Sequence, residues 1–158
     1  MMKDGLIAEL QTTRQFFLNS TSCLQEEDST YAPKKEMFSV AQHVAHVGKT
    51  VDWFIDGAFG TEGFNLNFDQ LTAETKTQKS LKQALESFEQ AINRAVQTIR
   101  DVSESELMTP LPDGPIMAGV PKMAVIGAIS EHTAHHRGAL TVYSRLLGKV
   151  PQMPYADA

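Results

Sequence analysis

Apolar side chains recur at helical spacing in four separate segments of this 158-residue chain. Apolar residues that repeat every three or four positions lie on one face of an α-helix, so each segment predicts an amphipathic helix. The clearest segment carries Lys, Gln and Glu on its other face and apolar residues at Leu81, Leu85, Phe88, Ile92, Ala95 and Ile99. The other three segments run from about Gly5 to Leu24, from Ser39 to Gly57 or Gly60, and from Pro121 to Leu147.

Capping and turn residues mark the ends of two of these helices. Residues 39–42 read Ser-Val-Ala-Gln, a capping box in which the first and fourth side chains satisfy free backbone N–H groups. Pro121 suits the first turn of a helix, because the N–H that proline lacks has no partner there. Gly148 and Pro151 then stop the last helix.

Three long connections separate the predicted helices, at residues 26–37, 60–77 and 108–121. Their Gly, Pro, Asn and Asp residues are typical of turns, so we expect loops. We also expect one short helical turn at residues 103–106 and a brief extended stretch at residues 113–119.

Four amphipathic helices joined in this way predict an all-α fold, a four-helix bundle with long connecting loops. The chain length is that of one ordinary domain, so we expect a single domain over residues 1–158. Long connections also permit a topology other than a simple up-down-up-down bundle.

The composition argues against several other classes of protein. A net charge of -5 disfavours a nucleic-acid-binding protein, which needs a basic face to neutralise phosphates. No apolar stretch approaches the roughly 18 residues of a membrane span, and the first residues lack the apolar run of an export signal. The only cysteine, Cys23, cannot form an intramolecular disulfide. We therefore expect a cytoplasmic protein that binds neither nucleic acid nor membranes.

All five histidines fall in two short clusters, one on the second predicted helix and one on the fourth. His132 and His136 are four residues apart within the apolar stripe of the fourth helix, so both should point into the bundle. His135 is turned by about 100° from His136, toward the flank of that helix. His43 and His46 are about 60° apart around the second helix, so both can lie near its inner face.

A metal ion explains this arrangement better than isolated core histidines, each hydrogen-bonded to a neighbour. Buried imidazoles are unfavourable unless their nitrogens find partners, and one ion satisfies several at once. Three histidines with one open position make the reactive kind of zinc site. The Glu-x-x-His motif of di-iron bundles is absent, and Thr133 stands where a zinc protease has glutamate.

Two stretches of the sequence resemble the DinB/YfiT-like metalloenzymes. They are "FSVAQHVAHV" with the following "TVDWF", and "EHTAHHRGALTVYSRLLG" in the last helix. The resemblance implies a four-helix bundle with a divalent metal on three histidines, which correspond here to His46, His132 and His136. His43 stands where the family often has a non-ligand, and His135 belongs to the His-His-Arg-Gly signature without being a ligand.

The same resemblance implies S-transfer from low-molecular-weight thiols, since relatives include bacillithiol transferases and a mycothiol-dependent maleylpyruvate isomerase. The open coordination position would also allow metal-dependent hydrolysis, because an ion there can ionise a bound water. The expected ion is zinc or nickel, with iron and manganese as alternatives, and the expected ligand at the ion is a small thiol or an anionic small molecule. The competing hypothesis is a non-enzymatic metal-binding or stress-response interaction module.

Further expectations concern residues near the histidines and the state of association. We expect Tyr143 to be a core aromatic residue and Arg137 to make a surface or interface salt bridge, while Trp53 either walls a pocket or packs in the core. A homodimer is expected because family relatives often pair. In addition, some aromatic residues fall outside the four apolar stripes, namely Phe59, Phe64 and Phe68.

Overall fold

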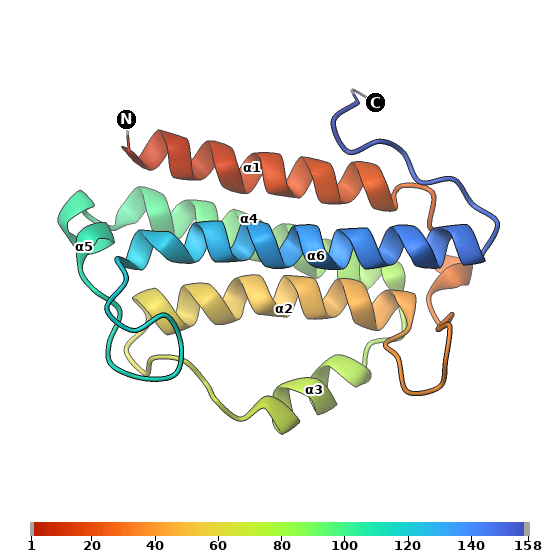
Figure 1. The fold of residues 1–158 in the computed structure, drawn as a ribbon, viewed down its shortest axis with the longest axis horizontal. Helices are drawn as coiled ribbons and strands as arrows, with labels where there is room; N and C mark the ends of the chain where they lie inside the picture. The colour runs from red at the N-terminus through yellow and green to blue at the C-terminus, as the bar shows by residue number, and fades with distance from the viewer. Residues whose placement is uncertain (1, 157–158) are drawn as a thin grey trace.

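The computed structural model describes residues 2–156, and its four long helices form a bundle (Figure 1). These helices are α1 (Met2–Thr21), α2 (Val40–Phe59), α4 (Leu81–Asp101) and α6 (Val125–Leu146). The connections hold two shorter α-helices and two 3-10 turns, namely α3 (Phe68–Lys76), α5 (Glu104–Met108), Glu26–Asp28 and Lys122–Ala124. The described residues include no β-strand, so the predicted all-α four-helix bundle is confirmed.

The capping box predicted before α2 is present. The Ser39 hydroxyl accepts a hydrogen bond from the backbone N–H of Gln42 at 3.3 Å, and the Ser39 N–H donates to Oε1 of Gln42 at 3.0 Å. Gly60 ends the helix, as one of the two predicted glycines. The side chains of Ser80 and Ser103 cap α4 and α5 in a similar way. Local sequence therefore fixes where these helices begin.

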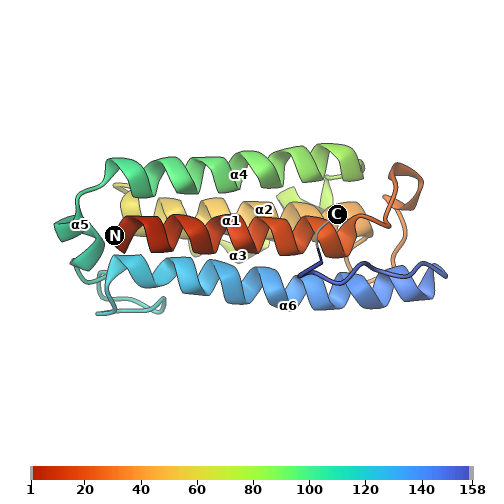
Figure 2. The same cartoon turned by 90° about the horizontal axis from the view of Figure 1, so that it is seen from above.

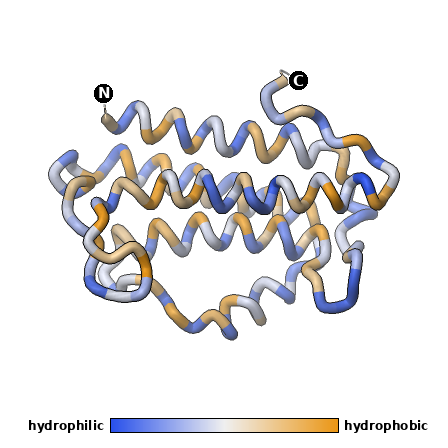
Figure 3. Tube along the Cα trace, viewed as in Figure 1, coloured by the Kyte–Doolittle hydropathy of each residue, from blue (hydrophilic) through white to orange (hydrophobic). Residues whose placement is uncertain are grey.

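The helices enclose one hydrophobic core, to which buried apolar residues of all four long helices contribute. Hydrophobic and hydrophilic positions alternate along these helices (Figure 3). Phe17 of α1 and Phe88 of α4 are fully buried, with ring centroids 4.6 Å apart. Helix α2 packs closely on α4, because a Cβ added at Gly48 would lie 3.0 Å from Cα of Phe88. A side chain at this position would push the two helices apart.

The bundle is not a simple up-down-up-down arrangement. Helices α2 and α4 run parallel to each other and antiparallel to α1 and α6 (Figures 1 and 2). Hydrogen bonds agree, since Ser29 binds the start of both parallel helices: its hydroxyl accepts from the N–H of Leu81, and its carbonyl accepts from the N–H of Ala41. Residues 60–80 carry the chain back along α2 so that α4 can begin beside the start of α2.

Two details of the connections differ from the sequence expectation. Residues 68–76, predicted as loop, form α3, which begins at Asn67 as its N-cap and packs against α2. The Gln42 side-chain amide donates to the carbonyl of Lys76 at 2.8 Å and ties the end of α3 to the start of α2. Residues 113–119, predicted as briefly extended, form turns. The short turn predicted near residue 103 is present as α5.

The aromatic residues that suggested a homodimer differ in their exposure. Phe59 and Phe64 are partly buried against the core, and Phe68 is 54% exposed. A homodimer therefore stays a prediction, and Phe68 is the one of these three residues that is exposed enough to support it. None of the helices in residues 2–156 has the length and apolar character needed to cross a bilayer.

Replacing Phe88 by alanine should lower the free energy of unfolding by about 3–5 kcal/mol, because the change leaves a cavity at the α1–α4 contact. Phe68→Ala is the matched control on an exposed ring and should cost less than about 1 kcal/mol. Urea denaturation followed by circular dichroism measures both values. Equal losses in the two variants would contradict the assigned core.

Candidate metal centre

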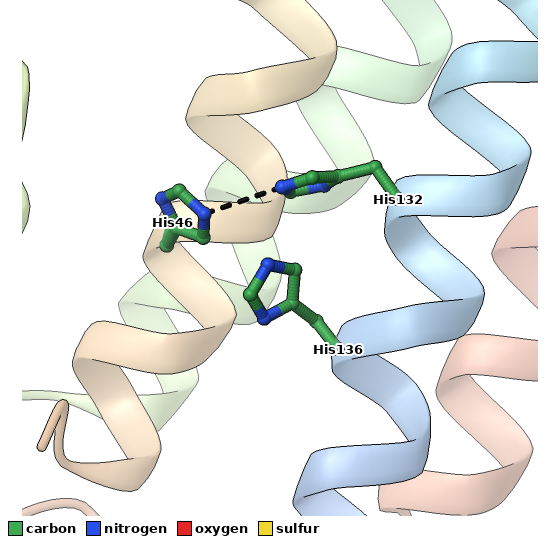
Figure 4. Close-up of side chains that lie close together, drawn as sticks. All are labelled: His46, His132 and His136. Atoms are coloured by element: carbon green, nitrogen blue, oxygen red, sulfur yellow. Dashed lines mark hydrogen bonds between the residues drawn. The ribbon is translucent and has the colours of Figure 1, made fainter. Parts of the chain in front are cut away.

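Helices α2 and α6 bring together the histidines that lie far apart in the sequence. His46 projects from α2, and His132 and His136 project from consecutive turns of α6 (Figure 4). Nε2 of His46 lies 3.2 Å from Nε2 of His132. One ring nitrogen from each of the three residues lies within 4.8 Å of the other two. The structure thus gathers the three side chains predicted as metal ligands.

His43 contacts this group through a hydrogen bond to His136. Its Nε2 shares a hydrogen bond of 2.7 Å with Nδ1 of His136, and its side chain is 7% exposed. Because Nδ1 of His136 is engaged in this way, Nε2 is the nitrogen left to face the other two rings. Figure 4 agrees, since one ring nitrogen of His136 points toward His46 and His132 while the other points away. His43 therefore fixes the orientation of His136.

Burial keeps these imidazoles uncharged at neutral pH. Burial is the larger cause and repulsion from neighbouring histidines the smaller, and together they lower the pKa of His43 and of His132 from the ordinary 6.5 to about 4. The same two causes lower the pKa of His136 to about 3. Burial also lowers the pKa of His46. Neutral imidazoles have a free electron pair on one nitrogen, which is the form that binds a metal.

The geometry of the group fits a small divalent ion. Tetrahedral zinc with Zn–N bonds of about 2.0–2.1 Å needs ligand nitrogens about 3.3 Å apart. The observed 3.2 Å between His46 and His132 matches this spacing before any adjustment. The third nitrogen lies within 4.8 Å of the other two, so all three are close enough together to approach a single ion. The donor set consists of imidazoles, which suit zinc and nickel as well as iron.

Other residues that the sequence singled out are not among the three converging side chains, although the ring of His135 contacts that of His136, with centroids 4.9 Å apart. His135 and Glu131 are exposed on α6. The Arg137 guanidinium lies 5.9 Å from the ring centroid of Phe16, so it contacts α1 and not the metal group. Tyr143 is a core residue as expected, because it is 3% exposed and its hydroxyl donates to the carbonyl of Phe38 at 2.9 Å.

A cavity of about 240 Å³ opens beside the histidines between α2, α3 and α6. His46 and His132 line one part of it. Trp53 also lines it, in agreement with one of the two interpretations of this residue from the sequence. Helix α3 supplies the opposite wall with Phe68, Leu71, Thr72 and Thr75. Sequence reasoning missed this wall because it missed α3. The available signal was Asn67, whose side chain accepts from the N–H of Gln70 as an N-cap.

Comparisons with known proteins agree with this architecture. YfiT from Bacillus subtilis, described as a probable metal-dependent hydrolase with an unusual four-helix bundle topology, is similar with a TM-score of 0.68 and 14% identity, covering 93% of this chain and 88% of that chain. The DinB-like protein YjoA from Bacillus subtilis is similar with a TM-score of 0.66 and 16% identity, covering 94% of this chain and 95% of that chain. At these identities the likeness concerns the fold. No curated protein matches the sequence.

The sequence itself carries the stronger indication of kinship. The family model of the DinB superfamily matches residues 9–140, which extend from α1 to the middle of α6 and include all five histidines. Because this match spans most of the chain, the chain belongs to the DinB superfamily.

Proposed function

We propose that this protein is a metal-dependent hydrolase that binds one divalent metal ion through His46, His132 and His136. The observation that carries the proposal is the convergence of three uncharged ring nitrogens beside a cavity. The description of the structural neighbour YfiT as a probable metal-dependent hydrolase supports the same reaction class.

The reaction depends on the coordination position that three protein ligands leave open. His46, His132 and His136 would hold the ion, which would lower the pKa of a coordinated water and polarise a substrate carbonyl. Residues of the chain support this arrangement: His43 orients His136, and apolar side chains line the cavity beside His46 and His132. Zinc is the ion that three imidazoles and one open position favour, with nickel as the next choice.

The same open position also accepts a thiolate, so transfer of a low-molecular-weight thiol is the other reaction to test. A panel of activated esters and a panel of thiols with an electrophile, each with and without chelator, separate the two reactions. Chelator-sensitive ester hydrolysis supports the hydrolase. Activity with the thiols alone would replace it by an S-transferase, and a protein that binds metal but is inactive in both panels would be a non-enzymatic module.

The ligand assignment predicts about one divalent ion per chain in protein purified without an affinity tag. His46→Gln, His132→Gln and His136→Gln should each lose the ion, because two imidazoles hold it too weakly to survive purification. His135→Gln is the matched control, since this exposed histidine lies on the same helix and should keep full occupancy. Elemental analysis by mass spectrometry measures all four. Full metal content in the His132 or His136 variant would refute the assignment.

Replacing His43 should weaken the site without removing a ligand. His43→Leu cannot accept a hydrogen bond from Nδ1 of His136, and loss of such a supporting partner lowers metal affinity by about 10- to 100-fold. His43→Gln retains an acceptor oxygen and should bind more tightly than His43→Leu. Competition against a chromophoric chelator gives both affinities, and circular dichroism checks the fold. If His43→Gln loses the ion while His46→Gln keeps it, His43 is the ligand and His46 is not.

Removal of the metal should leave the bundle folded, because the hydrophobic core extends through all four long helices and contains none of the three proposed ligands. Chelator-treated protein should keep its helicity and a cooperative thermal transition. After cobalt substitution, the visible spectrum should change when small anions or thiols are added. Unfolding of the metal-free protein, or a cobalt spectrum that no added ligand alters, would show a closed structural site.

A further inference from the structure

The wall of the cavity beside His46 and His132 is made mostly of hydrocarbon and aromatic surface. Helix α2 contributes Trp53 and Phe54, and α3 contributes Phe68 and Leu71. The rings of Trp53 and Phe54 are 4.9 Å apart, and Phe68 lies 6.2 Å from Trp53. These aromatic rings come from two helices and form a continuous apolar lining.

Three polar side chains of the same wall have hydrogen-bond partners within the chain, while the further hydroxyl, that of Thr72, belongs to an exposed residue. The Thr50 hydroxyl donates to the carbonyl of His46 at 2.9 Å, and the Thr75 hydroxyl donates to the carbonyl of Leu71 at 2.9 Å. The indole N–H of Trp53 donates to the carbonyl of Asn65 at 2.8 Å. With their donors used in this way, these three side chains offer a ligand mainly methyl groups and an aromatic face.

Charge is confined to the outer part of the cavity. Lys49 is exposed, and its ammonium group lies 3.5 Å from a carboxylate oxygen of Glu74. This pairing offsets the positive charge that Lys49 alone would present to an anion. The strongest polar feature that a ligand meets deeper in the cavity is therefore the pair of histidines, His46 and His132.

From this distribution we infer that the cavity binds the apolar, aromatic or branched aliphatic body of a small uncharged substrate, whose single metal-binding group lies at the histidines. The inference rests on the proposed metal-dependent function and adds the class of substrate. The volume of about 240 Å³ lies just below the usual range for drug-sized ligands, so the body is small. Ligands rich in hydroxyl groups are disfavoured, because most of their hydroxyls would lose water without gaining a partner on this largely apolar wall.

Two hydroxamates with the same metal-binding head test the inference in the cobalt-loaded protein. Benzohydroxamate presents a phenyl ring to the cavity, whereas acetohydroxamate presents a methyl group. Burial of the larger apolar body should make benzohydroxamate bind at least about tenfold more tightly, as measured from the cobalt spectrum. Equal affinities for the two compounds would overturn the proposed substrate class while leaving the metal site intact.

Wall variants locate the preference in this cavity. Leu71→Gln and Phe68→Ala should each reduce the ratio of the two affinities several-fold, because both residues line the cavity on α3. Leu146→Gln is the matched control for the first variant, since Leu146 is 59% exposed at the end of α6 and should leave the ratio unchanged. An unchanged ratio in both wall variants would place the phenyl ring elsewhere and refute the inference.

A third arm separates this inference from the proposed metal chemistry. Trp53 is the only tryptophan of the sequence, so its fluorescence reports on the cavity wall without any metal. Benzyl alcohol, which lacks the chelating head, should change this fluorescence in the metal-free protein, and Leu71→Gln should weaken the effect. If this response is present but neither hydroxamate alters the cobalt spectrum, the apolar cavity stands and the metal-dependent function fails. If benzyl alcohol has no effect, the apolar site itself is refuted.

Discussion

Packing of α6 against α2 places four imidazole rings in one partly dehydrated layer, and the properties of the centre follow from that packing. Each ring loses part of its water, which disfavours the charged form and lowers its pKa. The ring nitrogens then need hydrogen-bond partners other than water. His43 pairs with His136, and His46 pairs with His132. One atom is left over, because Nδ1 of His43 is buried without a hydrogen-bond partner among the described residues. A metal on Nε2 of His136 would place the proton of that ring on Nδ1, which would donate it to Nε2 of His43. The proton of the neutral His43 ring would then lie on its own Nδ1, which is the atom without a partner.

The parallel course of α2 and α4 has a direct effect on the site. A chain that ends α2 at one end of the bundle must return to the other end before α4 can begin, and residues 60–80 make this return. Helix α3 lies within that return and becomes the outer wall of the cavity. Gly57 assists, because a Cβ there would clash with the ring of Phe64, which packs over α2. The topology thus supplies both the cavity and its aromatic lining.

Local patterns were enough to predict the helices and much of the histidine geometry. The apolar period located all four long helices, the capping box located the start of α2, and the four-residue spacing placed His132 and His136 on one face. The sequence pattern alone left His43 and His46 equivalent, and the choice of His46 came from the family resemblance. Tertiary structure distinguishes them, because His43 reaches the far nitrogen of His136 and not the shared centre.

Helix α3 and the cavity could not be predicted in the same way. The segment of residues 68–76 is short and mostly polar, so it has no strong apolar stripe. Its helical form depends on packing against α2. The cavity lining combines residues from three helices, and no local pattern specifies which of them meet. Exposure of Phe64 was also misjudged from sequence, since its ring is partly buried against Trp53 and Phe54.

The long stretch of sequence between α2 and α6 determines when the histidine cluster can assemble during synthesis. His46 precedes His132 by 86 residues, and His43 precedes His136 by 93 residues. A ribosome therefore releases the two histidines of α2 long before their partners exist, and any ion captured then would have an incomplete set of ligands. Contacts of such long sequence separation form late in folding because closing a long loop is entropically costly. The three-histidine cluster can therefore form only after α6 has been synthesised and has docked against α2.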